Sequence, residues 1–267
     1  MRQKDCVAAI ERLTYPAAAA PWDVSGMQVA GLRDEVRRVA VCLDPTPASV
    51  GAALEGGADF ILSHHPLLLK GRLPSLPDAY HTVLRLLLRA DVPLYAAHTS
   101  LDVNIHGPAG WLADALCLGN RAVLEPTGHD TPRGPLGYGL AGDLPDPLPF
   151  DELARLLGRH LDLSTAAVCG TPPDRVRRIS FCGGSGSSLW PAAAALGADV
   201  HITGDVKYHT ALDARICMID VGHHSLEEEM MRRLVPLLAG ELPGTEVFFL
   251  PSVSPLRPLA GSDGARF

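Results

Sequence analysis

The sequence DEVRRVAVCLDPTPASVGAALEGGADFILSHH, residues 34–65, occurs a second time in altered form as DRVRRISFCGGSGSSLWPAAAALGADVHITGD, residues 174–205. Aligned without a gap, the two stretches share ten of 32 residues. The identities include Val-Arg-Arg near the start of each copy and Gly-Ala-Asp before its last apolar run. Two copies 140 residues apart indicate two related domains, because a solenoid needs at least three repeats of shorter period.

Each copy reads as a strand, a helix and a second strand. Short apolar runs predict buried strands, and Ala-rich runs that end at glycines predict helices. Because a strand-helix-strand unit of this length makes its two strands parallel, we expect an α/β fold with right-handed crossovers. A further strand is expected in each half. The expected elements are strands 39–43, 59–63 and 93–97 with helix 47–54, and strands 179–182, 199–203 and 215–221 with helix 189–196.

The composition is that of a folded protein without a general affinity for nucleic acids or membranes. Apolar residues make up 47% of the 267 positions, and the formal net charge is −7. Nucleic-acid binding would therefore need local patches, such as the pairs Arg37-Arg38, Arg177-Arg178 and Arg232-Arg233. The most apolar segment, 83–95, is interrupted by charges and too short for a bilayer, and no signal peptide is visible. We expect a cytoplasmic protein with reduced cysteines.

Histidines and carboxylates collect where the predicted strands end, and open α/β sheets place their ligand sites there. Imidazole nitrogen and carboxylate oxygen are preferred ligands of Zn, Mn, Fe, Co and Ni. Adjacent histidine side chains diverge, so a His-His pair suits two ions, which a shared carboxylate can bridge at roughly 3.5–4 Å. The clusters are His64-His65, His98 with Asp102, the segment 203–209, and His223 with Glu227.

Each cluster also has a structural interpretation. A His-His pair can be a hydrogen-bonded loop, and a His and a Glu four residues apart can lie on an exposed helix. The loop 183–186 suits a tight turn or, alternatively, an anion site. Asp205 and His209 are candidates for an acid and a base, with helix capping by Asp205 as the alternative. The candidate anion contacts are Gly184, Ser185, Gly186 and Lys207.

Six segments in order resemble those of the GTP cyclohydrolase 1 type 2 homologue family, also called Nif3-like dinuclear metal proteins. The likeness covers nearly the whole chain. The segments are WDVSGMQV (22–29), SHHP (63–66), AHTSLD (97–102), GGSG (183–186), ITGDVKYH (202–209) and DVGHHSLE (220–227).

The resemblance implies two similar, interlinked α/β domains with mixed, mainly parallel sheets, formed by residues 1–124 with 216–267 and by residues 125–215. It also implies a toroidal homohexamer with two divalent ions per subunit, in the short form that lacks the inserted domain of longer relatives. Glu227 is the implied bridge, and His98 lies beside the ligands as a further ligand or proton carrier. The implied metal ligands are His64, His65, Asp102, His223 and Glu227.

Two functions remain open at this stage. The first is a metal-dependent hydrolase acting on a guanine nucleotide ring, another nucleotide or a phosphoester, in which two ions activate a water molecule. In that hypothesis His98 or His209 carries the proton, and the ions divide between His64, Asp102 and Glu227 on one side and His65, His223 and Glu227 on the other. The second is a non-catalytic metal-binding or regulatory scaffold. Neither the metal nor the substrate can be specified from the sequence.

Overall fold

Strand β3, Phe60–Ser63, is the middle strand of a five-stranded sheet with the order β1-β4-β3-β2-β11. In the computed structural model, which describes residues 1–258, β4, β3, β2 and β11 run parallel and β1 pairs antiparallel with β4. The apolar run in β2 is buried on both faces, because Val39 and Val41 face one core cluster while Ala40 and Cys42 face another. The other strands are β1 (Gly26–Val29), β2 (Arg38–Cys42), β4 (Leu94–Ala96) and β11 (Glu246–Phe249).

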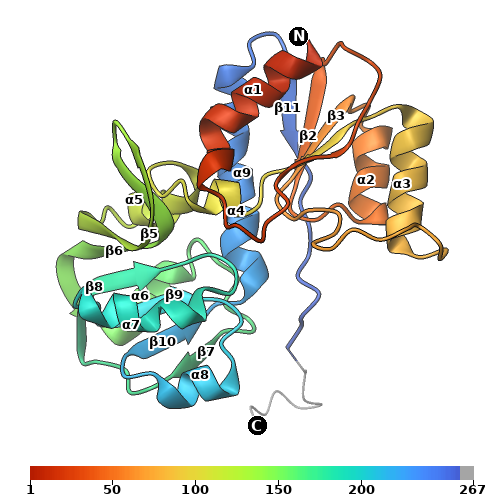
Figure 1. Ribbon diagram of the computed structural model, residues 1–267. Coiled ribbons are helices and arrows are strands. Elements are labelled where there is room, and N and C mark those ends of the chain that lie inside the picture. Colours follow the sequence, from red (N-terminus) through yellow and green to blue (C-terminus); the bar gives the residue numbers. More distant parts are fainter. Residues whose placement is uncertain (259–267) are drawn as a thin grey trace.

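Helices cover both faces of this sheet. Helices α2 and α3 lie on one face, and α1 and α9 lie on the other (Figure 1). Helix α2 begins at a capping box in which Thr46 and Ser49 each accept a hydrogen bond from the other's backbone amide. Within the described residues, no helix has the length and apolar character needed to cross a membrane. The helices of this unit are α1 (Gln3–Thr14), η1 (Pro16–Ala18), α2 (Pro47–Glu55), α3 (Ala79–Ala90), α4 (Thr99–Asp102), η2 (Pro108–Gly110), α5 (Trp111–Ala115) and α9 (His223–Glu241).

Six strands form the second sheet, in the order β5-β6-β8-β9-β10-β7. Its centre, β8-β9-β10, is parallel, and the strands on either side pair antiparallel. The strands are β5 (Gly119–Thr131), β6 (Gly134–Pro149), β7 (Ala167–Cys169), β8 (Arg175–Phe181), β9 (Val200–Thr203) and β10 (Cys217–Asp220). The helices are α6 (Phe150–Leu157), η3 (Gly186–Leu189), α7 (Trp190–Ala195) and α8 (Tyr208–Asp213).

The residues shared by the two sequence copies make the same contact in both sheets. The Asp59 carboxylate accepts hydrogen bonds from the backbone amides of Arg37 and Arg38 at 2.9–3.1 Å. Asp199 does the same for the amides of Arg177 and Arg178, at 2.8 and 2.9 Å. Each aspartate therefore satisfies amides at the start of the neighbouring parallel strand. The arginine pairs thus lie at equivalent positions in the two sheets, and the contact that both copies share is made by their backbone amides.

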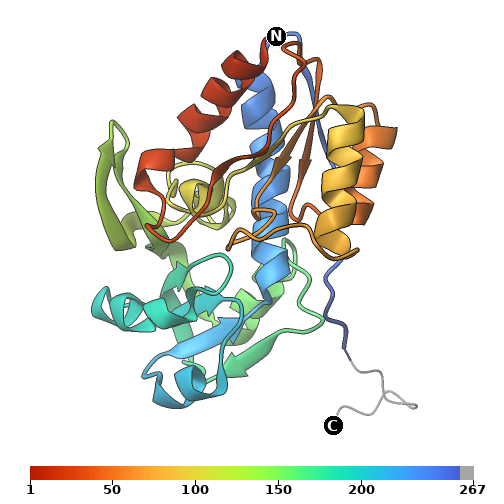
Figure 2. The ribbon, with the colours of Figure 1, turned by 45° about the vertical axis from the view of Figure 1, so that its right-hand side comes forward.

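Helix α9 connects the two units. It leaves the second sheet after β10 and packs on the first, and it lies between the units in both views (Figures 1 and 2). Leu226 and Met230 of this helix belong to one core cluster with Val41 of the first sheet and Ile202 of the second. This shared core accounts for the interlinked arrangement of the two units.

The sheets place the limits of the second unit at residues 119 and 220, since β5 begins at Gly119 and β10 pairs with β9. We propose this division in place of the expected 125–215. Residues 259–267, which the expected first domain includes, lie outside the described residues.

The predicted α/β fold with two mixed sheets is confirmed. The strand-helix-strand elements of both copies are present at the expected positions, within a few residues. The long hairpin β5–β6 was not predicted, because its many glycines and prolines suggest turns rather than strands.

A buried polar pair distinguishes the second sheet from the first. His201 donates from Nε2 to the carbonyl oxygen of Gly186 at 3.1 Å, and its Nδ1 lies 2.9 Å from Ser180 Oγ. The equivalent residues of the first copy are the apolar Ile61 and Ala40. Burial lowers the pKa of His201 to about 4, because an imidazolium ion there would lose its hydration.

This depressed pKa predicts a loss of stability in mild acid. Between about pH 6.5 and pH 4 the unfolded chain takes up a proton on His201 and the folded chain does not, so the free energy of unfolding falls as the pH is lowered, by about 3 kcal/mol in total from this group. Urea unfolding at several pH values measures the slope. A His201→Gln variant should flatten it, whereas His209→Gln, the same change at an exposed site, should not. An unchanged slope in His201→Gln would contradict the assignment.

Candidate metal centre

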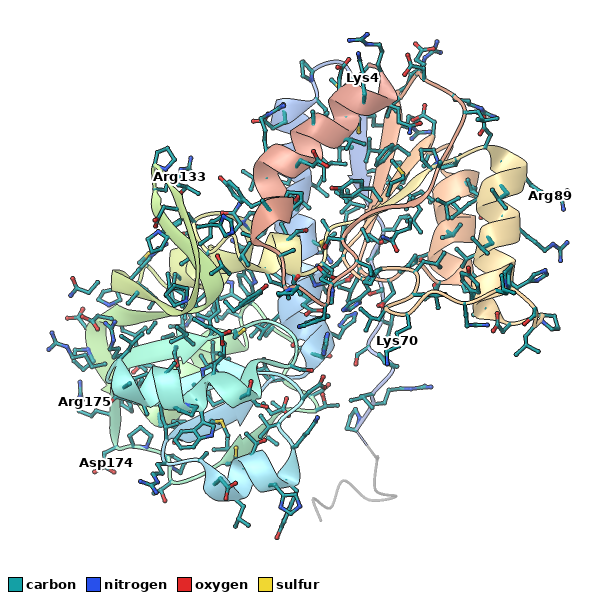
Figure 3. The ribbon with its side chains drawn as sticks, in the orientation of Figure 1. Lys4, Lys70, Arg89, Arg133, Asp174 and Arg175 are labelled. Carbon is teal, nitrogen blue, oxygen red and sulfur yellow. The ribbon has the colours of Figure 1, made fainter. Side chains whose placement is uncertain are left out.

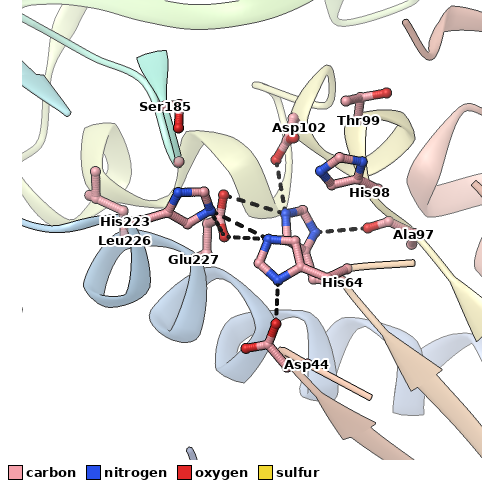
Figure 4. A network of polar contacts seen from close by, with 12 residues as sticks. Asp44, His64, Ala97, His98, Thr99, Asp102, Ser185, His223, Leu226 and Glu227 are labelled. Atoms are coloured by element: carbon pink, nitrogen blue, oxygen red, sulfur yellow. Dashed lines mark hydrogen bonds and ion pairs between the residues drawn. The ribbon is translucent and has the colours of Figure 1, made fainter. Parts of the chain in front are cut away.

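Five side chains meet where the two units join. His64 and His65 directly follow β3, Asp102 ends α4, and His223 and Glu227 lie at the start of α9 (Figure 4). These residues come from the carboxyl ends of strands β3, β4 and β10, or from the helices that follow them. The expected gathering of His64, His65, Asp102, His223 and Glu227 is therefore present in the structure.

The five side chains form two triads that share Glu227. In the first triad, His64 Nε2 lies 3.5 Å from Glu227 Oε1 and 3.7 Å from Asp102 Oδ1. In the second, Glu227 Oε2 lies 3.2 Å from His65 Nε2 and 3.0 Å from His223 Nε2. Within each triad, the candidate ligand atoms all lie within 4.8 Å of one another. Glu227 thus turns one oxygen toward each triad.

The three histidines of the triads each make a hydrogen bond from Nδ1, on the side of the ring that faces away from the cluster. His65 donates to Asp44 Oδ1 at 2.8 Å, and His223 donates to Asp205 Oδ2 at 2.7 Å. His64 donates to the carbonyl oxygen of Ala97 at 2.8 Å. Because each acceptor is an oxygen, the proton resides on Nδ1, and Nε2 of a neutral ring is left as an acceptor that faces the cluster. This is the usual arrangement behind metal-binding histidines.

The cluster requires positive charge at its centre. His64 Nε2 is buried without a hydrogen-bond partner, and the Nε2 atoms of His65 and His223 lie 3.4 Å apart. Lone pairs that face one another or a carboxylate at these distances repel, unless protons or metal ions lie between them. A set of imidazole and carboxylate donors suits first-row divalent ions. The residues therefore fit the metal centre that the resemblance implies.

The same charges shift the pKa values of the side chains in the cluster. The hydrogen bond from His223 to Glu227 raises the pKa of His223 to about 9, although burial opposes this shift. Burial also opposes the charged form of His65, but its hydrogen bonds to Asp44 and Glu227 raise its pKa to about 10. Burial likewise disfavours the anion of Glu227, yet the surrounding imidazoles hold the pKa of Glu227 well below its usual range. Burial and the nearby Glu227 charge raise the pKa of Asp102.

The glycine loop 183–186 packs directly on Glu227. Gly184 has a φ of +58°, and a Cβ there would overlap Glu227 Oε1. The loop connects β8 to η3. The close approach to the carboxylate explains Gly184, whereas a Cβ at Gly186 would overlap Cys182 instead. Ser185 Oγ donates to Asp205 Oδ2 at 2.5 Å, which links the loop to the carboxylate behind His223.

His98 lies beside the triads and forms a third group with His64 and His65. Its Nδ1 donates to Asp23 Oδ1 at 2.8 Å, and Ser25 and Thr99 also donate to the Asp23 carboxylate. Burial opposes ionisation of Asp23, but these hydrogen bonds hold the pKa of Asp23 far below its usual range. His98 is therefore fixed in orientation by an ionised carboxylate, as His65 is by Asp44.

The cluster opens into a cavity of about 720 Å³. Asp102, His223, Glu227 and His98 are among the residues that line it. Further walls come from residues 17–22 and from the glycine loop.

Not every predicted site residue reaches this cavity. Lys207 and His209 are exposed at the start of α8, and neither lines the cavity. The chain turns away after β9, where Asp205 adopts a φ of +53° and the amide of Val206 donates to Asp220 at 2.8 Å. Asp205 itself stays close, as the partner of His223. The structure brings Asp205, but neither Lys207 nor His209, to the centre.

Two carboxylates that matter here were not singled out from the sequence. Asp44 follows β2 directly, so its strand-end position was an available signal, and Asp23 lies within the segment WDVSGMQV. His224, the second member of its pair, points elsewhere: its Nε2 lies 2.8 Å from Ser252 Oγ.

Comparisons with known proteins show the family and agree with the fold. The family profile described as Duf34/NIF3 (NGG1p interacting factor 3) matches residues 1–255. A Streptomyces coelicolor protein named GTP cyclohydrolase 1 type 2 homolog is 32% identical, over 85% of this chain and 81% of that protein. A protein of the same name from Streptococcus pneumoniae is 32% identical, over 88% of this chain and 90% of that protein.

Solved structures show the same architecture. A hypothetical protein from Staphylococcus aureus superposes with a TM-score of 0.88 at 26% identity, covering 97% of this chain and 99% of that chain. A Bacillus cereus protein related to NIF3 superposes with a TM-score of 0.87 at 23% identity, covering 98% of this chain and 99% of that chain. At this identity the likeness shows the fold alone. Fold and site together define an α/β protein of two mixed sheets with a His/Asp/Glu cluster that could hold metal ions. The chain belongs to the Duf34/NIF3 family.

Metal binding should release protons. Because the carboxylates raise the pKa of His65 to about 10 and that of His223 to about 9, both rings carry protons at pH 7 in chelator-treated protein, and a metal ion must displace them. The apparent affinity for Zn²⁺ should therefore fall as the pH is lowered from 9. Titration calorimetry in two buffers of different ionisation enthalpy counts the protons. A binding heat that is independent of the buffer would contradict this prediction.

The glycine loop predicts a second, steric effect on metal binding. Gly184→Ala places a methyl group against Glu227 Oε1 and should weaken metal binding by about tenfold or more. Gly197→Ala is the matched control, since Gly197 also has a positive φ, of +74°, but nothing within 4 Å of an added Cβ. The control should lose about 1–2 kcal/mol of stability and keep its metal affinity. Equal metal affinities in the two variants would show that the contact with Glu227 is unimportant.

Proposed function

We propose that this protein is a dinuclear-metal-dependent hydrolase. The observation that supports the proposal is the position of Glu227, which offers one oxygen to each of two triads on the wall of a cavity. His64, Asp102 and Glu227 would hold one ion, and His65, His223 and Glu227 the other. Such a pair of divalent ions would lower the pKa of a water molecule and polarise a substrate oxygen.

Other residues of the site would hold the ligand rings in place, carry the proton and contact the substrate. Asp44 and Asp205 fix the rings of His65 and His223 through Nδ1. His98 lines the cavity with Nδ1 held by Asp23, which leaves its Nε2 to accept a proton from the attacking water and deliver it to the leaving group. Gly184, Ser185 and Gly186 line the same cavity and would contact a polar or anionic group of the substrate.

The substrate class follows the relatives' names. Proteins named GTP cyclohydrolase 1 type 2 homolog suggest hydrolysis of a nucleotide ring, with another nucleotide or phosphoester as the wider class. The toroidal homohexamer and the cytoplasmic location are proposed on the family resemblance, and light scattering on the purified protein tests the first. A non-catalytic metal-binding scaffold is the alternative function.

Replacement of the shared carboxylate tests the hydrolase. Protein loaded with Mn²⁺, Zn²⁺, Fe²⁺ or Co²⁺ should hydrolyse at least one member of a panel of nucleotides and phosphodiesters. Glu227→Gln should lower metal affinity by about 100-fold and abolish turnover, because both triads lose a charged ligand. Glu229→Gln makes the same change two residues along α9, at a side chain paired with Arg233, and should keep both properties.

The outcomes separate the two functions. Loss of metal and of turnover together in Glu227→Gln supports catalysis at this centre. Turnover that survives without metal places catalysis elsewhere. Tight metal binding with no turnover across the panel favours the scaffold.

A further inference from the structure

No lysine or arginine is among the described residues that line the cavity. Its acidic wall residues are Asp102, Glu125 and Glu227, and the others are histidines, Trp22, Tyr138, Leu189 and small or hydroxyl-bearing residues. Lys4, Arg89, Arg133 and Arg175 extend from the outer edges of the molecule (Figure 3). With the ligand histidines neutral in metal-loaded protein, positive charge on the cavity wall would therefore come mainly from bound metal ions.

The carboxylates around the centre already balance such ions. Asp102 and Glu227 belong to the triads, Asp44 and Asp205 stand behind two of the histidines, and Glu125 lies on the cavity wall. Their summed negative charge exceeds the four positive charges of two divalent ions. A nucleoside triphosphate brings several further negative charges, and no side chain in this cavity would neutralise them.

The wall near the mouth of the cavity is aromatic and apolar. Trp22 exposes 62% of its surface, and its ring meets the edge of His98 with centroids 5.8 Å apart. Tyr138 lines the cavity too, but its hydroxyl is buried. The exposed indole of Trp22 offers a planar ligand a stacking surface. The volume of about 720 Å³ is within the range of pockets for small organic ligands.

We propose that the substrate is a planar nitrogen heterocycle, such as a nucleobase or nucleoside, that carries at most one negative charge and lies against Trp22. This inference rests on the proposed hydrolase and shifts its substrate class from the nucleotides that the relatives' names suggest to rings without a polyphosphate. The ring would reach from Trp22 past His98 to the metal centre, and triphosphates would bind more weakly than the parent nucleosides.

Binding measured apart from turnover tests the proposal. Calorimetry on zinc-loaded protein compares guanosine, adenosine and uridine with their mono- and triphosphates. At least one nucleoside should bind, and its triphosphate should bind at least about tenfold more weakly. Trp22→Leu should weaken nucleoside binding by about tenfold or more through loss of stacking, and Trp22→Phe should restore most of it. Zinc content is measured for every variant, so that a change in metal loading is recognised.

Charge reversal on the wall tests the electrostatic part. Glu125→Lys should raise the affinity for the triphosphate relative to its nucleoside by about tenfold, and Glu125→Gln should have a smaller effect in the same direction. A wild-type triphosphate that binds more tightly than its nucleoside, no nucleoside binding at millimolar concentration, or an unchanged affinity in Trp22→Leu would each overturn the proposal. None of these results depends on whether the panel shows turnover, so this inference and the hydrolase proposal fail separately.

Discussion

The burial of one ionised carboxylate, Glu227, organises the centre of this protein. Glu227 is 3% exposed, and its negative charge is stabilised only by the groups that surround it. The three imidazoles turn Nε2 toward it because oxygens elsewhere hold their Nδ1 atoms. Gly184 lacks a side chain because that carboxylate occupies the space. The two units are connected here by the hydrogen bond between His223 and Asp205 and by the apolar core that α9 shares with both sheets.

The duplicated framework supports two different halves of the site. Asp59 and Asp199 make equivalent backbone contacts in the two sheets, which explains why these positions are identical. The residues at the candidate metal centre, in contrast, differ between the two copies. The position of Asp44, which holds His65, is Gly184 in the second copy, and the position of His65 is Asp205, which holds His223. The first copy thus supplies His65 together with its partner Asp44. The second copy supplies Asp205, whose partner His223 lies on helix α9.

The fold and the central candidate ligands could be predicted from the sequence, whereas the positions of Lys207 and His209, the role of Asp23 and the hairpin β5–β6 could not. Strand ends of parallel sheets converge, so His64 and Asp102 could be grouped from strand positions. That Glu227, which follows a strand of the other sheet, joins them was implied by the family resemblance. Lys207 and His209 also follow a strand, but a left-handed residue at Asp205 directs the chain away from the cavity, and no local pattern indicates that turn. Asp23 acts on His98 across 75 positions of sequence, and the hairpin β5–β6 contains residues typical of turns. Such features depend on tertiary contacts.

The order of elements along the chain affects how the protein is made. The whole second sheet lies in sequence between α5 and α9, and β11, which pairs with β2, comes last. A nascent chain that has emerged as far as β10 therefore has His64, His65 and Asp102 without the two ligands of α9. Because domains fold as units during synthesis, the ion-binding centre can be completed only after the ribosome has delivered α9 and most of the polypeptide. Metal ions bound at this centre would thus enter late in the biogenesis of the protein, once α9 has been synthesised.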